Sequence, residues 1–98
     1  MKANTRDVNG IAVIKVDGKI TIGAGDQQLR DVIASASSNK ILLDLSGVTT
    51  IDSSGIGELV GSYTTVTNKG GKLKLLHVTQ LITVFEVYEN ENEALASF

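Results

Sequence analysis

The nearly uninterrupted apolar run Lys40–Leu45 constrains the fold of this chain more than any other feature of its sequence. Apart from its first residue, only Asp44 interrupts a series of large aliphatic side chains, and a strand with so little polar alternation is typical of a parallel sheet covered on both faces. The run Lys72–Leu76 has the same character, and the segment between the two runs has helical periodicity. Strands that alternate with helices imply parallel pairs joined by right-handed crossovers. The sequence therefore predicts an α/β fold.

Turn-forming residues near the N-terminus predict an opening β-hairpin. Asn9-Gly10 and Asp17-Gly18 are turn signals, and they flank the strand-like run Ile11–Val16. We expect Lys19–Ile22 to form the second arm of this hairpin. The glycines of Gly23-Ala24-Gly25 then end the strand pattern.

Helical patterns occur in two central segments and at the C-terminus. Asp26 is a suitable N-cap for a helix from Gln27 to about Ala36, and a second helix is predicted from Ser54 to the terminating pair Gly70-Gly71. The second helix is expected to bury a stripe at i, i+3, i+4 spacing, formed by Ile56, Leu59, Val60, Tyr63 and Thr67. A last strand is predicted over Thr83–Tyr88, a polar turn over Glu89–Asn92 and a short terminal helix over Glu93–Phe98.

These elements predict one domain over residues 1–98, a small α/β fold with a mixed, mostly parallel sheet, an opening hairpin and packed helices. A chain of 98 residues is long enough for a single core. The connection from Leu76 to Thr83 is shorter than the dozen or so residues that a parallel crossover needs. We expect either a repositioned last strand or residues missing from the chain, and the loop geometry favours the second explanation.

The composition excludes several classes of protein. The net charge of −2 gives no basic footprint for nucleic acid or for an anionic membrane. The absence of cysteine excludes a disulfide framework, a thiolate nucleophile and a cysteine-based zinc site. Neither a signal peptide nor a membrane span is evident in the sequence, so we expect a cytoplasmic protein.

The junction Ile51-Asp52-Ser53-Ser54-Gly55-Ile56-Gly57-Glu58 carries the chemical information in the sequence. It places two adjacent hydroxyls between a predicted strand and a predicted helix. A helix N-terminus has free backbone N–H groups and a partial positive charge. A hydroxyl at this position can cap the helix, hold an anion or become an anion through phosphorylation.

Cofactor binding, serine catalysis and metal binding are all weakly supported. The glycines Gly55, Gly57 and Gly61 depart from the dinucleotide spacing, and close helix packing explains them equally well. The pattern G-x-S-x-G is absent, and His77 is the only histidine, with no spacing that links it to a serine. Carboxylates do not cluster with His77 at metal-ligand spacing. We therefore predict no catalytic residue, no metal and no cofactor.

Two roles remain for the hydroxyls of Ser53 and Ser54, as a helix cap and as an acceptor of phosphate. Serine is a preferred N-cap, and one serine could cap while the other points outward. A phosphate would add a charge of about −1.5 to −2 where the helix favours anions, so the fold should tolerate it. The neighbouring Asp52 would feel repulsion, and a partner docked on this surface would meet a new dianion. Such a modification would switch the surface and leave the fold unchanged.

The sequence resembles the STAS domains, in particular the bacterial anti-sigma factor antagonists. The segments that carry the resemblance are Ile41–Val48, Ile51–Gly57 and Gly70–Leu73, and a looser likeness extends over the whole chain. The resemblance implies a STAS fold in which a helix lies between the last two strands, and it implies that the protein is not an enzyme.

The resemblance also implies a mechanism of partner switching. The unmodified protein binds a serine kinase that is also an anti-sigma factor, and the sigma factor is released. Phosphorylation by the kinase weakens the complex, and a serine phosphatase restores it. The implied acceptor is Ser53, with Ser54 as the second choice. The implied partner-binding residues are Asp52, Ser53, Ser54, Gly55, Ile56 and Gly57, with Gly23 and Asp26 from the loop Ile22–Asp26, which should lie beside them.

In the resemblance, Asp52 shapes the charge of the site, and Gly55 and Gly57 leave the start of the helix uncovered. Many relatives carry an acidic residue at the end of the second strand, where this chain reads Lys19-Ile20-Thr21-Ile22. An alternative function for the same fold is an unphosphorylated scaffold or an accessory subunit, in a stress-signalling complex or in a lipid ABC transporter.

Overall fold

A computed structural model describes residues 1–77 and 87–98 of the chain and contains five strands and three helices within that part. Their order is β1 (Lys2–Val8), β2 (Ile11–Ile20), α1 (Asp26–Ala34), β3 (Lys40–Ile51), α2 (Ser53–Asn68), β4 (Lys72–Leu76), β5 (Val87–Tyr88) and α3 (Glu91–Ala96). The strands form one sheet in the order β1-β2-β3-β4-β5, in which only the β1–β2 pair is antiparallel. The predicted α/β fold with a mixed, mostly parallel sheet is confirmed.

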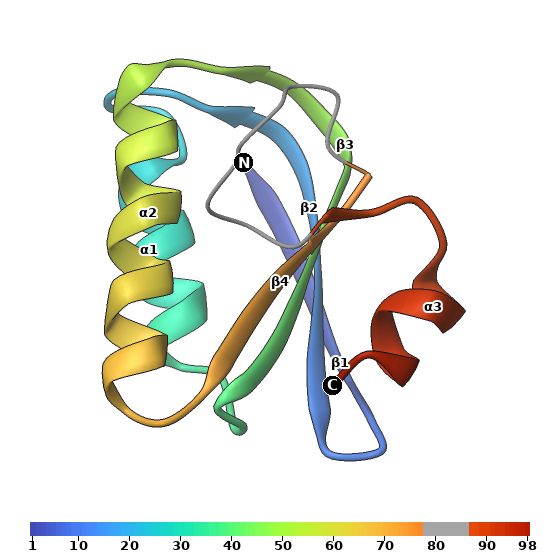
Figure 1. Ribbon diagram of the computed structural model, residues 1–98. Coiled ribbons are helices and arrows are strands. Elements are labelled where there is room, and N and C mark those ends of the chain that lie inside the picture. The colour runs from blue at the N-terminus through green and yellow to red at the C-terminus, as the bar shows by residue number, and fades with distance from the viewer. Residues whose placement is uncertain (78–86) are drawn as a thin grey trace.

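The sheet is covered on both faces, which explains its apolar strands. Helices α1 and α2 lie side by side on one face, and α3 covers the other (Figure 1). Successive residues of a strand point to opposite faces, so Ile14 and Leu43 belong to the core beneath α1 and α2, whereas Val13 and Leu42 belong to a smaller core beneath α3. All four side chains are at most 1% exposed. The strands therefore lack polar alternation because both faces of the sheet are buried, as the sequence predicted.

The opening hairpin exists, but its arms lie earlier in the chain than predicted. Asn9-Gly10 connects β1 to β2, and both residues have positive φ angles of 54° and 82°. Asp17-Gly18 does not form a turn between two arms. The pairing of β2 with β3 shifts register there, so β2 passes through an irregularity and continues to Ile20. The prediction that Lys19–Ile22 forms the second arm is wrong. Asp17-Gly18 forms an irregularity within β2 and not a turn, because β2 stays paired with β3 on both sides of it.

Strand β3 is also longer than predicted. It continues beyond the predicted run Lys40–Leu45, through Ser46-Gly47, to Ile51. The extension is supported by β2, since Gly47 pairs with Asp17 and Ile51 pairs with Ile20. The prolonged pairing brings the ends of β2 and β3 to the same edge of the sheet.

The helices begin and end close to the predicted residues, but α2 buries a different stripe. Its buried residues are Gly55, Leu59, Ser62 and Val66, whereas Val60 is 39% exposed. Two of these four residues, Gly55 and Ser62, are small and not strongly apolar. A search for apolar residues at helical spacing therefore does not find the stripe that packs on the sheet. The helix ends at Asn68 and is followed by Gly70 with a φ of 77°, as the glycine pair predicted.

The C-terminal elements differ in detail from the prediction. Strand β5 comprises Val87–Tyr88 and pairs in parallel with β4, while residues 83–86 of the predicted strand and residues 78–82 of the short connection lie outside the described residues. Helix α3 begins at Glu91, within the predicted polar turn. The carboxamide oxygen of Asn90 accepts hydrogen bonds from the backbone N–H groups of Asn92 and Glu93, at 2.8 and 3.3 Å, which caps the helix two residues early.

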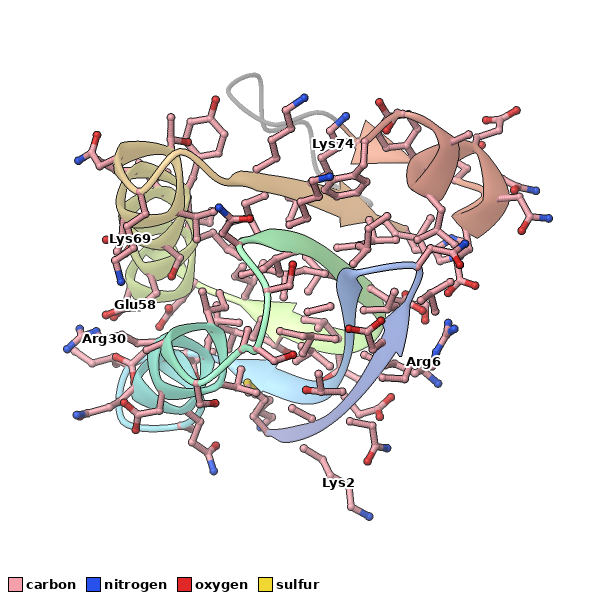
Figure 2. All side chains as sticks on the ribbon, turned by 90° about the horizontal axis from the view of Figure 1, so that it is seen from below. Lys2, Arg6, Arg30, Glu58, Lys69 and Lys74 are labelled. Atoms are coloured by element: carbon pink, nitrogen blue, oxygen red, sulfur yellow. The ribbon has the colours of Figure 1, made fainter. Side chains whose placement is uncertain are left out.

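A buried lysine attaches the C-terminus to the sheet. Lys74 of β4 is 5% exposed, and its Nζ donates to the backbone oxygen and to the hydroxyl of Ser97, both at 2.9 Å. The ammonium group also lies 4.8 Å from the centre of the Phe98 ring and 5.8 Å from that of Tyr88. Figure 2 shows Lys74 on the side of the molecule occupied by α3, away from the pair Arg30 and Glu58. These contacts replace the water that a buried ammonium loses.

We predict that Lys74→Met loosens α3. The substitution keeps an apolar stem but removes the donors to Ser97, which should cost about 1.5–3 kcal/mol of unfolding free energy, as for a hydrogen bond to a charged group. Chemical denaturation gives the free energy, and hydrogen exchange should show faster exchange in α3 than in α1. Lys72→Met, on an exposed position of the same strand, is the matched control, and equal stability of the two variants would contradict the role of Lys74.

Candidate functional site

The predicted site lies where β2 and β3 end and α2 begins. Because Ile20 and Ile51 are paired in parallel, the segments that follow them leave from the same edge of the sheet. The segment after β2 folds back at once, since the backbone N–H and C=O groups of Thr21 and Ala24 bond to each other reciprocally at 2.9 Å. Gly23, at φ 71°, occupies the tip of this turn. The loop Ile22–Asp26 therefore lies beside the start of α2, as expected.

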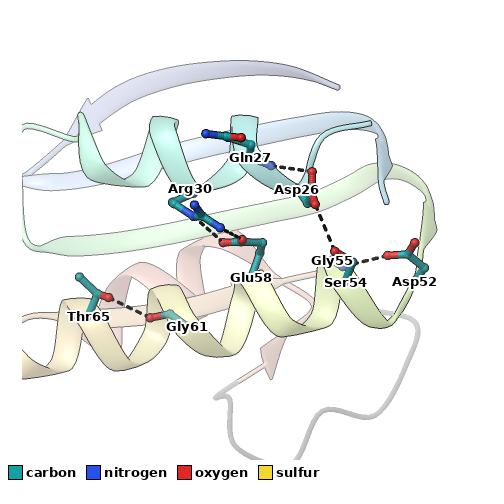
Figure 3. Close-up of polar contacts among 9 residues, drawn as sticks. All are labelled: Asp26, Gln27, Arg30, Asp52, Ser54, Gly55, Glu58, Gly61 and Thr65. Carbon is teal, nitrogen blue, oxygen red and sulfur yellow. Dashed lines mark hydrogen bonds and ion pairs between the residues drawn. The ribbon is translucent and has the colours of Figure 1, made fainter. Parts of the chain in front are cut away.

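Asp52 caps α2 and also holds the neighbouring loop. One carboxylate oxygen accepts a hydrogen bond from the backbone N–H of Gly55 at 2.9 Å, and the other accepts one from the backbone N–H of Ile22 at 3.0 Å. The expectation that a serine caps the helix is wrong, because the aspartate one residue earlier has the extended backbone of an N-cap and supplies the acceptor. Figure 3 shows the hydrogen bond between Asp52 and Gly55 at this end of the helix.

The hydrogen bonds to Asp52 favour its charged form. The backbone N–H groups of Gly55 and then of Ile22 lower the pKa of the Asp52 carboxyl below its ordinary value. The group therefore remains an anion at neutral pH. It contributes a fixed negative charge immediately before Ser53.

The two glycines of the motif face in opposite directions. A Cβ atom at Gly55 would lie 2.1 Å from the backbone oxygen of Ile20, so only glycine allows this close approach of α2 to β2. A Cβ atom at Gly57 would meet no atom within 4 Å. The expectation that both glycines leave the helix start uncovered is therefore correct for Gly57 and wrong for Gly55, which is buried against the sheet.

Ser54 is bound to the first residue of α1. Its hydroxyl donates a hydrogen bond to Asp26 Oδ2 at 3.1 Å, while Asp26 Oδ1 accepts one from the backbone N–H of Gln27 at 2.8 Å (Figure 3). Asp26 is not the N-cap that the sequence predicted. The cap is Gly25, in the left-handed region at φ 106°, and Asp26 is the first helical residue. Its carboxylate is therefore turned towards α2.

Ser53 differs from its polar neighbours. It is exposed on the first turn of α2, and its hydroxyl makes no hydrogen bond within residues 1–77 and 87–98. Ile56 is half-buried on the next turn. The structure thus brings the predicted residues of the motif together with the loop that contains Gly23 and Asp26.

Sequence reasoning missed two features of this region. Ile22 supplies a backbone donor to Asp52, and its own side chain is 76% exposed; a large aliphatic residue next to a glycine-rich turn was the available signal. Arg30 of α1 forms a two-pronged ion pair with Glu58 of α2, in which Arg30 Nε lies 3.1 Å from Glu58 Oε2. Only the opposite charges hinted at this pair. Both residues line a groove of about 490 Å³ between α1 and α2.

Within residues 1–77 and 87–98, no group of three or more histidine, cysteine, aspartate or glutamate side chains could hold a metal ion. In the same part of the chain, no helix has both the length and the apolar character needed to cross a membrane.

Comparison with known proteins identifies the family. The family model described as STAS domain matches residues 2–94. The chain belongs to the STAS family. The anti-sigma F factor antagonist of Paenibacillus polymyxa is 26% identical over 99 residues, an alignment that covers 88% of this chain and 85% of that protein.

Solved structures of STAS proteins share the fold. A putative anti-sigma factor antagonist of Thermotoga maritima superposes with a TM-score of 0.85 at 19% identity, over 97% of this chain and 92% of that chain. The anti-sigma factor antagonist SpoIIAA in its unphosphorylated form has a TM-score of 0.76 at 20% identity, over 98% and 96% of the two chains. The phosphorylated form of SpoIIAA from Bacillus has a TM-score of 0.75 at 19% identity, over 98% of each chain. The predicted STAS fold is confirmed, whereas the helix that the resemblance implies between the last two strands lies outside the described residues.

We predict opposite effects of alanine at the two glycines of the motif. Gly55→Ala places a methyl group against the Ile20 carbonyl and should destabilise the domain by about 1–3 kcal/mol, the usual cost of overpacking. Gly57→Ala enters open space and should leave stability unchanged or raise it by up to about 1 kcal/mol through helix propensity. Urea unfolding of both variants tests this difference. Equal destabilisation by the two substitutions would contradict the close approach at Gly55.

We also predict a pH-dependent contribution of the Asp52 cap. The pKa of Asp52 is lower in the folded protein than in the unfolded chain, so the unfolded state binds the proton more readily. The contribution is present above the unfolded pKa, near 3.8, and is lost as the pH falls through the folded pKa. The melting temperature of the wild type should exceed that of Asp52→Asn by most near neutral pH, and the gap should close at low pH. Asp7→Asn, near the end of β1, serves as the control, and a gap that widens in acid would refute the assignment.

Proposed function

We propose that this STAS protein is an anti-sigma factor antagonist controlled by phosphorylation of Ser53. In its unphosphorylated form it binds an anti-sigma factor that is also a serine kinase, and the sigma factor is released. It carries out no catalysis itself and acts in the cytoplasm. The name of the Paenibacillus polymyxa relative and the phosphorylated form of SpoIIAA support this function.

The observation that carries the proposal is the free hydroxyl of Ser53. Around it, Asp52 is occupied with two backbone N–H groups, and Ser54 is bound to Asp26. Ser53 alone in this group is exposed and makes no hydrogen bond within the described part of the chain. A kinase can therefore reach this hydroxyl without first breaking a contact that holds the fold.

The electrostatics of the site explain how one phosphate would change partner binding. The N-terminus of α2 carries a partial positive charge, so the fold tolerates an anion on Ser53. The phosphate would add a charge of about −1.5 to −2 beside the anionic Asp52. A partner surface that matches the unmodified site would face concentrated negative charge after phosphorylation, and like-charge contacts across an interface are strongly unfavourable.

The proposed partner surface comprises exposed residues of the motif and of the adjacent turn, together with the half-buried Ile56. Helix α2 contributes Ser53, Ile56 and Gly57 to this surface, and the loop after β2 contributes Gly23. Asp26, Asp52, Ser54 and Gly55 contribute by fixing these elements, since their polar groups or backbone are engaged inside the protein. A serine phosphatase would reverse the modification.

We predict that the cognate kinase and ATP place phosphate on Ser53. Mass spectrometry after proteolysis should locate it there in the wild type. Ser53→Ala should abolish the modification, and Ser54→Ala should retain it. Phosphate on neither serine of the wild type would refute the proposed switch.

A negative charge at Ser53 should also weaken the complex without unfolding the protein. Ser53→Asp should raise the dissociation constant for the kinase at least about tenfold, equivalent to 1.4 kcal/mol, while its melting temperature stays near that of the wild type. Asn68→Asp, an isosteric change of the same charge at the exposed far end of α2, is the control. Isothermal titration calorimetry measures both, and equal affinities of the two variants would contradict the electrostatic mechanism.

A further inference from the structure

The two adjacent serines are chemically unequal because of one residue in α1. The Ser54 hydroxyl is partly buried and donates to Asp26 Oδ2 at 3.1 Å, a contact between residues 28 positions apart. Ser53 is exposed and has no such contact within the described residues. The difference therefore depends on where the fold places the Asp26 carboxylate.

The fold leaves the Asp26 carboxylate little freedom to move. Its second oxygen accepts the backbone N–H of Gln27 at 2.8 Å. Gly25, immediately before it, is buried at φ 106°, and a Cβ atom there would lie 2.1 Å from the backbone oxygen of Lys19. Glycine at this position lets the chain pass close to β2 and directs Asp26 towards α2. The ion pair of Arg30 with Glu58, one helical turn further along both helices, holds the two helices together (Figure 3).

We infer that Asp26 is a positioning residue that selects Ser53 over Ser54 as the phosphate acceptor. This inference rests on the proposed function. In the transfer, a serine oxygen forms a bond to the γ-phosphorus of ATP, the bond from that phosphorus to the bridging oxygen of ADP breaks, and the hydroxyl proton passes to a base of the kinase. At Ser54, the new phosphate would form next to the Asp26 carboxylate and would break the hydrogen bond from Ser54 to Asp26. At Ser53, it would form in solvent.

The selection has two physical components, which different substitutions of Asp26 separate. Asp26→Asn keeps an oxygen that can accept the Ser54 hydroxyl but removes the negative charge. Asp26→Ala removes both. Repulsion between Asp26 and an anion at position 54 should disappear in both variants, whereas the hydrogen bond should disappear only in the alanine variant.

Single cysteines test the placement of Asp26 without any kinase, because the natural chain contains no cysteine. The probe is N-ethylmaleimide, a neutral reagent that reacts with the thiolate. The S53C thiol should react at least about tenfold faster than the S54C thiol, since one pKa unit changes the thiolate fraction tenfold. Adding Asp26→Asn to S54C should recover about tenfold in rate and shift the pH profile of labelling to lower pH. The charged groups near this thiol are Asp26, Asp52 and the ion pair of Arg30 with Glu58.

Matched controls separate a local effect from general loosening of the fold. Asp31→Asn changes the same charge at an exposed position of α1 and should leave the S54C rate unchanged. Asp26→Asn should likewise leave the S53C rate within twofold. Equal labelling rates of S53C and S54C, or no response of S54C to Asp26→Asn, would overturn the inference.

The kinase then tests the selection itself. With ATP, Ser53→Ala should take up no phosphate, whereas Ser53→Ala combined with Asp26→Ala should take up phosphate on Ser54. If the wild type is phosphorylated but the double variant stays unmodified, the role of Asp26 in selection is refuted. A wild type that takes up no phosphate refutes the proposed function, and the thiol measurements still decide whether Asp26 restrains position 54.

Discussion

The geometry of the site depends on the carboxylate of Asp52, which joins the start of α2 to the loop after β2. One oxygen holds the first turn of α2 through Gly55, and the other holds the loop after β2 through Ile22. Without this bridge, the helix start would lack its cap and Ile22 would lose its hydrogen bond to Asp52. The parallel pairing of Ile20 with Ile51 brings the loop after β2 next to the start of α2. Because Gly55 has no side chain, α2 can also pass close to the backbone oxygen of Ile20.

The bridge also determines which polar groups remain available. Each carboxylate oxygen of Asp52 accepts a backbone N–H group, and one of these bonds caps α2, so neither serine is needed as a cap. Ser54 is then used to bind α1 through Asp26, and Ser53 alone points outward. Capping, helix docking and exposure to partners are thus divided among three consecutive residues. This division explains how an exposed hydroxyl can lie at a helix N-terminus without capping that helix.

The sequence predicted the fold well where burial alone determined the structure and less well where contacts between distant residues determined it. The apolar runs at β3 and β4 predicted parallel strands because double burial leaves a direct mark on composition. Asp17-Gly18 was predicted to be a turn, because its pairing with Gly47 and Val48 of β3 joins residues far apart in the chain and leaves no mark on the local sequence. The capping role of Asp52 and the contact of Asp26 with Ser54 were missed for the same reason. The motif itself was found, but which of its residues caps, docks or stays free required the structure.

The proposed switch is separate from the fold because of where the stabilising contacts lie. The main core lies under α1 and α2, and the smaller core lies under α3 on the opposite face of the sheet, where Lys74 holds the C-terminus. Neither core includes the Ser53 side chain. A phosphate on Ser53 would therefore leave both cores and the Asp52 cap in place, while it changes the charge that an approaching protein meets. A phosphate on Ser54 would instead break the hydrogen bond that Ser54 donates to Asp26 of α1, so the proposed switch stays independent of the fold only while the acceptor is Ser53.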